Sequence, residues 1–134
     1  MVLLDTHALL WLDSGAPMTR ESLASIDDAA GRGEVLVSPV SAWEIGLLVR
    51  KRRIRLDLEP LPWFERFLSL PGVRLMPLGI AAAISSSFLA EPFHGDPADR
   101  LLVATARTLP ATLITRDAKI LSYSEAGHLR ALAC

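Results

Sequence analysis

One short stretch of the sequence, VLLDTHALLWL at residues 2–12, indicates the fold class. Val2 to Leu4 is a short apolar run of the kind found in buried strands. It ends at Asp5, and His7 to Leu12 then predicts a short helix, which Ser14-Gly15 closes. A strand that leads at once into a helix is the first half of a βαβ unit, from which parallel sheets are built.

The same alternation continues along the rest of the chain. Further strands are predicted at Val35–Val37, Val73–Met76 and Thr112–Thr115, with a fifth at Leu129–Ala133. Helices are predicted from Thr19 to Gly31 or Gly33, Ser38-Pro39 to about Arg53, Pro60 or Pro62 to Pro71-Gly72, Ile80 to Ala90, Asp96-Pro97 to about Leu109, and in a short segment from Asp117. Short apolar strands alternating with helices predict an α/β fold, with a parallel sheet covered by helices on both faces.

Length and composition narrow the class of protein. The chain has 134 residues, 51% of them hydrophobic, so we expect one domain over residues 1–134 that folds without a disulfide or metal staple. Its net charge of −1 excludes a globally basic nucleic-acid or membrane binder, although charge can still be local. The single cysteine, Cys134, excludes an intrachain disulfide, and no apolar run is long enough to span a membrane. A cytoplasmic protein is therefore expected.

Five acidic residues fall where a parallel sheet binds its ligands, outside the carboxyl ends of the strands. Asp5 ends the first predicted strand and Asp117 the fourth. Asp96 and Asp99 lie in the first turn of the helix before that fourth strand. Glu44 is six residues beyond Ser38, which places it about 8 Å along its helix. All five side chains can therefore reach one edge of the sheet.

Glu44 is on an apolar face of its helix, because Val40, Leu47 and Leu48 lie three or four residues away from it. Asp99 is placed in the same way. Buried carboxylates are costly unless they are paired or bind a metal, and converging ones raise each other's pKa. A divalent cation removes both problems, and an all-oxygen ligand set suits Mg²⁺ or Mn²⁺ better than zinc.

Each acid also has a simpler explanation. Asp5, Asp96 and Asp117 are each placed to cap the amino end of a helix, and the helix dipole favours Asp99 in a first turn. Glu44 could form a buried ion pair with an arginine. Helix caps are common, so any one acid fits this interpretation, but the gathering of all of them at one edge favours a metal site.

Four segments of the chain resemble the motifs of PIN-domain proteins of the VapC type, the toxins of VapBC toxin–antitoxin pairs. The segments occur in the family's order and are Leu3–Trp11, Ser38–Ile45, His94–Ala104 and Leu113–Asp117. The resemblance implies a three-layer α/β/α sandwich with a central parallel sheet of about five strands. It also implies an endoribonuclease that depends on Mg²⁺ or Mn²⁺ and leaves a 5′-phosphate and a 3′-hydroxyl.

The resemblance assigns roles to particular residues. It implies that Asp5, Glu44, Asp99 and Asp117 are the catalytic and metal-binding acids, whereas Asp96 lies beside the third of them and is expected to be a cap. Thr115 matches a hydroxyl position near the fourth acid and is a candidate for contact with the substrate or its phosphate. The implied partners are an RNA substrate, a cognate VapB-like antitoxin and a second copy of the chain.

Several basic residues are candidates for contact with substrate. Five of the 14 lie close together and are Arg50, Lys51, Arg52, Arg53 and Arg55. This cluster is either a phosphate-binding patch, with Arg52 and Arg53 as its best candidates, or a solvated helix end. Arg100 and Arg116 each neighbour a proposed ligand, so pairing with those acids is expected, and contact with a phosphate is the alternative.

Aromatic residues are expected to serve packing. Trp11, Trp43 and Trp63 are predicted to be core or interface residues and not platforms for base stacking. The amphipathic stripe Trp63-Phe64-Phe67-Leu68 is predicted to pack in the core, with a groove for a partner as the alternative.

Two other functions compete with the nuclease. A haloacid-dehalogenase-like phosphatase also places an Asp at the end of its first strand, but that chemistry needs a second Asp two residues later, where this chain has His7. A catalytically silent PIN-like module, which binds RNA or a partner without cutting, is the second alternative. The presence of all four acids argues against it.

Overall fold

The computed structural model describes all 134 residues and contains a five-stranded sheet in the order β3-β2-β1-β4-β5. The strands are β1 (Val2–Leu4), β2 (Val35–Val37), β3 (Val73–Leu75), β4 (Thr112–Thr115) and β5 (Arg130–Ala133). Every pair of neighbouring strands is parallel, as the alternation of strands and helices predicts. The strand order reverses direction beside β1, so β1 and β4 meet at the switch point where such sheets place their ligands.

Seven α-helices and one 3-10 helix connect the strands. They are α1 (Thr6–Ser14), α2 (Arg20–Gly31), α3 (Pro39–Arg50), α4 (Pro60–Leu68), α5 (Ile80–Ser85), the 3-10 helix η1 (Ser86–Phe88), α6 (Pro97–Thr108) and α7 (Ala118–Glu125). The predicted helix over Ile80–Ala90 is wrong in its second half, where the chain tightens into η1 and then leaves the helical conformation at Leu89. None of these helices combines the length and the apolar character that a membrane crossing requires.

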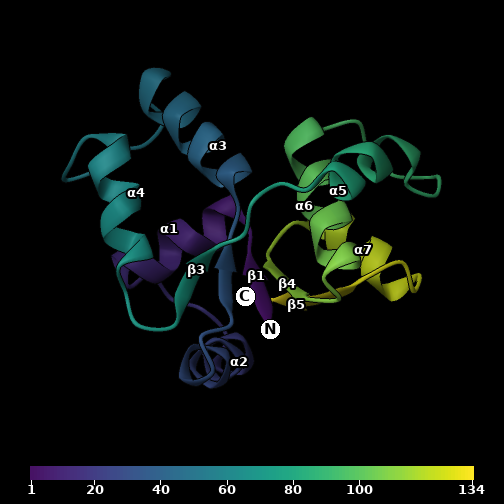
Figure 1. Ribbon diagram of the computed structural model, residues 1–134, viewed down its shortest axis with the longest axis horizontal. Helices are drawn as coiled ribbons and strands as arrows, with labels where there is room; N and C mark the ends of the chain where they lie inside the picture. The colour runs from purple at the N-terminus through teal and green to yellow at the C-terminus, as the bar shows by residue number, and fades with distance from the viewer.

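Two apolar layers cover the two faces of the sheet. Alternate residues of β1 point to opposite sides, so Val2 and Leu4 pack with α1, α2 and α4, while Leu3 packs with α5, α6 and α7. Figure 1 shows these two groups of helices on either side of the strands. The expected three-layer α/β/α architecture is therefore confirmed. Trp63 and Phe67 of α4 are each 1% exposed, which confirms that the aromatic stripe belongs to the core.

Helix α3 ends three residues earlier than predicted because the chain turns at Arg52. The backbone N–H of Arg52 donates to Val49 O at 3.0 Å, and that of Arg53 donates to Leu48 O at 2.9 Å. This pair of bonds is the Schellman motif, which needs a left-handed residue, and Arg52 has a φ of 57°. A side chain in that conformation costs about 1 kcal/mol. The turn sends Arg52 in a different direction from its two neighbours.

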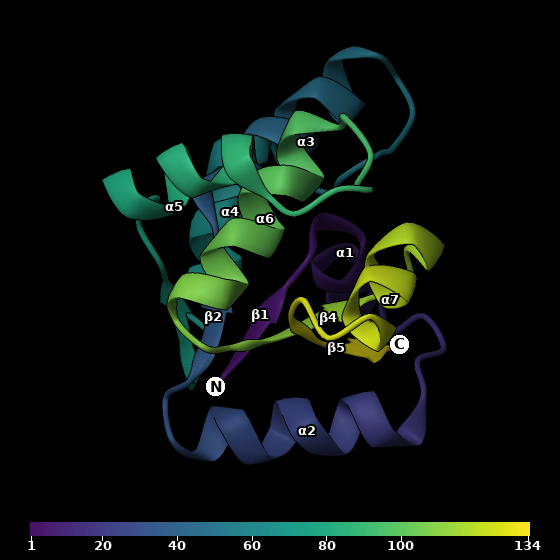
Figure 2. The same cartoon turned by 90° about the vertical axis from the view of Figure 1, so that its right-hand side faces the viewer.

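The end of the sheet at which β1 and β2 begin carries paired charges. Arg32, which follows α2, contacts Asp28 through Nη1 and Glu34 through Nε, at 2.5 and 2.9 Å. The amino group of Met1 lies 3.3 Å from Glu34 as well. Figure 2 shows α2 lying along the sheet, with its C-terminal end close to the N-terminus of the chain. The charges here form a surface network in which each carboxylate has a cation.

Candidate metal centre

A cavity of about 450 Å³ lies at the carboxyl ends of β1 and β4. The two strands are adjacent, with Leu4 opposite Ile114, so the residues that follow them emerge side by side. The cavity is lined by all five acids that the sequence placed at this edge, together with five other residues: Asp5, Thr6, His7, Trp11, Glu44, Asp96, Asp99, Leu102, Arg116 and Asp117. The structure thus brings together the four acids that the motifs single out, from four separate segments of the chain.

Asp5 and Asp117 each cap a helix and also line the cavity. Asp5 Oδ1 accepts the backbone N–H of Ala8 at 2.7 Å and caps α1, and Asp117 Oδ1 accepts that of Ile120 at 2.9 Å and caps α7. Each carboxylate uses one oxygen for the cap, and its second oxygen remains for a ligand. The cap therefore fixes the orientation of each acid at the cavity.

Glu44 reaches the cavity from α3 and is held by a hydroxyl group. Thr6 Oγ1 donates to Glu44 Oε1 at 2.5 Å and also hydrogen-bonds Ser41 Oγ at 3.0 Å. Glu44 has no ion pair with an arginine, so that alternative is wrong. Burial raises the pKa of the Glu44 carboxyl, the bond from Thr6 opposes the rise, and the charge of Asp96 adds to it.

Asp96 and Asp99 lie together at the start of α6. Asp96 Oδ1 accepts the backbone N–H of Asp99 at 3.0 Å, which confirms Asp96 as the cap of this helix. Burial raises the pKa of Asp99 to about 7, and the negative charges of Asp96, Asp117 and Glu44 contribute to the rise. A carboxyl group with this pKa is only partly ionised at neutral pH, because no cation of the protein compensates its charge.

Thr115, the last residue of β4, forms hydrogen bonds to two of the acidic residues. Its side chain is fully buried at 0% exposure, so the expected contact with substrate is wrong. Thr115 Oγ1 accepts the backbone N–H of Asp117 at 3.1 Å. Burial raises the pKa of Asp5, and a hydrogen bond from the Thr115 side chain opposes that rise. Thr115 therefore positions two of the acids and touches no ligand.

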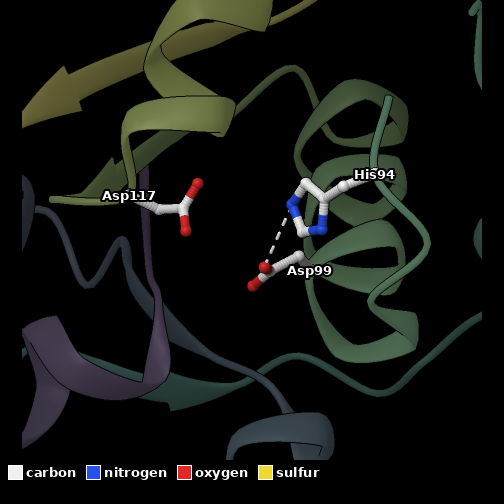
Figure 3. Close-up of side chains that lie close together, drawn as sticks. All are labelled: His94, Asp99 and Asp117. Carbon is white, nitrogen blue, oxygen red and sulfur yellow. Dashed lines mark ion pairs between the residues drawn. The ribbon is translucent and has the colours of Figure 1, made fainter. Parts of the chain in front are cut away.

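His94 completes a cluster with Asp99 and Asp117. One ligand atom from each of the three side chains lies within 4.8 Å of the others, and Figure 3 shows the three pointing toward a common space. His94 Nε2 lies 3.2 Å from Asp99 Oδ2 without the alignment of a hydrogen bond, and this buried nitrogen has no hydrogen-bond partner. His94 Nδ1 accepts the N–H of Asp96 at 3.3 Å, so in the neutral ring the proton is on Nε2, facing Asp99. The Nε2 atom of His94 therefore faces the same space as the carboxylates of Asp99 and Asp117.

The arrangement fits a hard divalent cation. Five of the ten residues that line the cavity are carboxylates, and burial raises the pKa of Asp5, Glu44 and Asp99. A cation with a preference for oxygen would neutralise this cluster, as Mg²⁺ and Mn²⁺ do in proteins. The cavity is lined by five carboxylates and no cysteine, which makes zinc a poor fit.

Arg100 and Arg116 are predicted to pair with the neighbouring acids, but neither of them forms an ion pair. Arg100 Nε donates to Ser86 O at 2.9 Å, and its Nη1 lies 3.3 Å from His94 O, so its charge holds the loop before α6 in place. Arg116 Nη2 donates to Pro17 O at 3.0 Å and Cys134 O at 2.9 Å. Its guanidinium also stacks on Trp11, 3.8 Å from the ring centre.

Sequence reasoning missed three of the supporting residues, namely Thr6, Ser41 and His94. Ser41 and Glu44 are three residues apart on one face of α3, which is a signal for a shared partner. That partner, Thr6, directly follows Asp5 and could have been proposed on this ground. The contact of His94 with Asp99 depends on the path of the loop before α6, which no periodicity predicts.

A parallel α/β sheet with an acidic centre at its switch point defines the class of protein, and comparison with known proteins gives the family. The chain matches the PIN domain family over residues 2–126. It is 32% identical over 124 residues to Ribonuclease VapC22 of Mycobacterium tuberculosis, with 91% of each chain covered. This protein therefore belongs to the PIN domain family, which confirms the resemblance of its motifs.

Solved structures agree with this assignment. The fold is similar to VapBC2 from Rickettsia felis bound to a DNA fragment from its promoter, with a TM-score of 0.71 and 16% identity over 99% of this chain and 98% of that one. It is also similar to DNA-bound VapBC from Salmonella typhimurium, with a TM-score of 0.67 and 16% identity over 98% of this chain and 96% of that one. These likenesses confirm the expected fold.

Proposed function

We propose that this protein is a metal-dependent endoribonuclease and the toxin of a toxin–antitoxin pair. The observation that carries the proposal is the convergence of four carboxylates, from four separate segments, on one cavity. The name of the mycobacterial relative, Ribonuclease VapC22, supports the same reaction, and the VapBC neighbours support an antitoxin as partner. The reaction is the hydrolysis of RNA phosphodiester bonds.

We assign the cation site to Asp5, Glu44, Asp99 and Asp117, with Mg²⁺ or Mn²⁺ as the ion. When bound, the cation supplies Lewis-acid activation of the scissile phosphate and a water of lowered pKa. The chain contributes orientation: the helix caps hold Asp5 and Asp117, Thr6 holds Glu44, and His94 faces Asp99. These contacts keep the acids in place while the site is empty of substrate.

Arg116 is the cationic side chain best placed to contact a phosphate. It lines the same cavity as the acids, while Pro17, Cys134 and Trp11 fix its position. Only its Nη2 is engaged by these carbonyls, so Nε and Nη1 remain available to a phosphate oxygen. Arg100 is not assigned this role, because carbonyl groups of the chain already engage its donors.

The proposal extends to assembly. We propose that residues 1–134 act as one PIN-like domain. All five strands form one sheet, and the four acids of the site come from positions between Asp5 and Asp117 in the sequence. A homodimer is proposed through the exposed face of α5 and η1, where Ile80 and Phe88 are each 81% exposed and Ile84 is 58% exposed at four-residue spacing. The proposed location is the cytoplasm, where an RNA-cleaving toxin meets its substrate.

A cleavage assay tests the reaction. Purified protein is incubated with mixed structured RNAs in Mn²⁺, in Mg²⁺ and in EDTA, beside an Asp99→Asn variant and an Asp28→Asn variant as a matched control. We expect cleavage by the wild type and the control in either metal, and none in EDTA or by Asp99→Asn. Binding of Mn²⁺ and RNA without cleavage of any RNA would instead favour the silent module.

The dimer is tested separately by light scattering after size-exclusion chromatography. Ile84→Glu or Phe88→Glu places a charge on the exposed face of α5 and η1, and we expect a monomer from either variant. A wild-type monomer over the micromolar range, or a dimer that persists in both variants, would contradict this assembly.

A further inference from the structure

A second hollow of about 240 Å³ adjoins the acidic cavity. It lies between α3 and the start of α6 and is lined by Trp43, Glu44, Leu47, Leu48, Lys51, Arg53, Asp96, Pro97 and Ala98. Glu44 and Asp96 line both spaces, so the hollow is a continuation of the acidic cavity. A strand whose phosphate lies at the acids would pass along this groove.

Trp43 forms one wall of the groove and is exposed. The residue is 55% exposed, so of its two expected locations, core or interface, the core is wrong. Trp43, Leu47 and Lys51 follow one another at four-residue spacing along α3, so they share one face of the helix. An indole on the surface beside a proposed active site offers a flat face on which a base can stack.

Lys51 and Arg53 supply positive charge to the same groove. Both side chains are exposed, and neither forms an ion pair with an acid of the chain. The left-handed turn at Arg52 separates the basic cluster, because Arg52 lines a different hollow between the end of α3 and the start of α4. Arg52 is therefore not the substrate contact that the sequence suggested, while Arg53 remains one.

We propose that the groove of Trp43, Lys51 and Arg53 binds the single-stranded segment of RNA that flanks the scissile phosphate. Trp43 stacks on an unpaired base, and Lys51 and Arg53 bind phosphates of the backbone. Sequence-tolerant recognition of single strands combines these two elements, an aromatic face and a line of cations. The inference rests on the proposed nuclease function and names the part of the substrate that this surface recognises.

The charges of the groove favour RNA over an acidic protein segment. Lys51 and Arg53 would attract either one, but the inner end of the groove carries Glu44 and Asp96. Those acids repel a peptide carboxylate, whereas a cation bound beside them would attract a phosphate. The continuity of the groove with the acidic cavity therefore matches a polyanion that must reach the metal centre.

Binding is measured with fluorescein-labelled single-stranded RNA of 12 nucleotides, by anisotropy, in an Asp99→Asn background that prevents cleavage. Trp43→Ala should weaken binding roughly 10-fold, and Trp43→Phe should retain most of the affinity because it keeps an aromatic face. Lys51→Ala and Arg53→Ala should each reduce the slope of log affinity against log salt by about 0.7. Arg52→Gly removes the same charge next to both, suits the left-handed backbone, and should leave the slope unchanged.

Kinetics of the otherwise wild-type protein give an independent readout. Trp43→Ala should raise KM roughly 10-fold with little change in kcat. Unchanged RNA affinity and KM in Trp43→Ala, with cleavage intact, would overturn this inference and leave the nuclease function standing. A Trp43→Ala protein that changes only its oligomeric state would assign the residue to a protein interface and also overturn it. Wild-type protein that neither binds nor cleaves RNA would contradict the proposed function itself.

Discussion

The carboxylates at the two ends of the sheet differ in whether a cation lies beside them and in the direction of their pKa shifts. At the end where β1 and β2 begin, Glu34 contacts both Arg32 and the amino group of Met1, and the hydrogen bond from Arg32 lowers the pKa of Glu34. At the carboxyl end, no lysine or arginine pairs with Asp99, and burial raises the pKa of Asp99 to about 7. One chain therefore places compensated acids at one end of its sheet and uncompensated acids at the other.

This difference separates structural charge from functional charge. An acid that stabilises the fold is accompanied by its own cation, as Glu34 is by Arg32. Acids that are gathered and left without cations raise the free energy of the empty protein, and a ligand must compensate them. Helix capping alone does not distinguish the two groups, because Asp5 and Asp117 cap helices and line the cavity at once.

The largest expected effect is on cleavage. Asp5→Asn should lower kcat at least about 100-fold, because loss of a metal ligand costs more than loss of a residue that only orients one. The fold should survive, since Asn caps a helix as well as Asp does. Glu34→Gln, at the opposite end of the sheet, should leave kcat unchanged. Steady-state cleavage of an RNA substrate measures kcat for both variants. Full activity in Asp5→Asn would contradict the conclusion that only the acids at the carboxyl end serve catalysis.

The next effect is stabilisation by metal. Mn²⁺ at 100 times its Kd should add about 2.7 kcal/mol to the free energy of unfolding of the wild type, because it binds the folded protein alone. Glu44→Gln should lose most of this gain, and Glu34→Gln should keep it. Thermal melts with Mn²⁺ and with EDTA provide the measurement. An equal shift in all three proteins would mean that the ion binds elsewhere.

The pH dependence should have opposite signs at the two ends. The pKa of Asp99 rises from 3.8 in the unfolded chain to about 7 in the folded one, so the folded state holds the proton more tightly between these values. The stability of the metal-free protein should therefore fall as pH rises from about 4 to 7, and Asp99→Asn should flatten the fall. Glu34 has a lowered pKa, so its contribution is present at neutral pH and is lost as the pH falls through the folded value.

Urea denaturation in EDTA at a series of pH values tests whether Asp99 and Glu34 change the free energy of unfolding in opposite directions as the pH rises. Glu34→Gln should reduce the loss of stability at acidic pH without altering the fall toward pH 7. Identical pH profiles for the wild type and Asp99→Asn would contradict the uncompensated state of the acids.

The smallest effect is expected from the paired end itself. Glu34→Gln should lower Tm by roughly 1–3 °C, because exposed ion pairs contribute little. The difference should shrink in 1 M NaCl, which screens surface charges. A large loss of stability in this variant, unaffected by salt, would show that the pairing at this end is more than a surface network.

Much of the site could be predicted from sequence because its acids follow regular elements. Asp5 and Asp117 end strands whose apolar runs are unmistakable, and Glu44 interrupts the apolar face of a helix, so their meeting at one edge follows from topology. His94 could not be placed in this way. It lies in a loop whose path depends on irregular contacts such as that of Arg100 with Ser86, 14 residues earlier in the chain.

The errors of prediction have the same origin. Adjacent opposite charges in the sequence predict that Arg100 and Arg116 pair with neighbouring acids. Arg116 instead reaches Pro17 and Cys134, to which only the folded chain brings it close. The sequence predicts Trp43 to be a core or interface residue, but the exposure of a side chain depends on what covers its face of the helix, and a helical pattern does not specify that cover.

The central place of β1 has a consequence for the synthesis of the protein. More than one hundred residues separate Asp5 from Asp117, and β1 cannot pair with β4 until the ribosome has released residues 112–115. Contacts of such high sequence separation form late, and large parts of the chain must already be ordered when they do. The nascent chain therefore lacks a complete acidic centre for most of its translation.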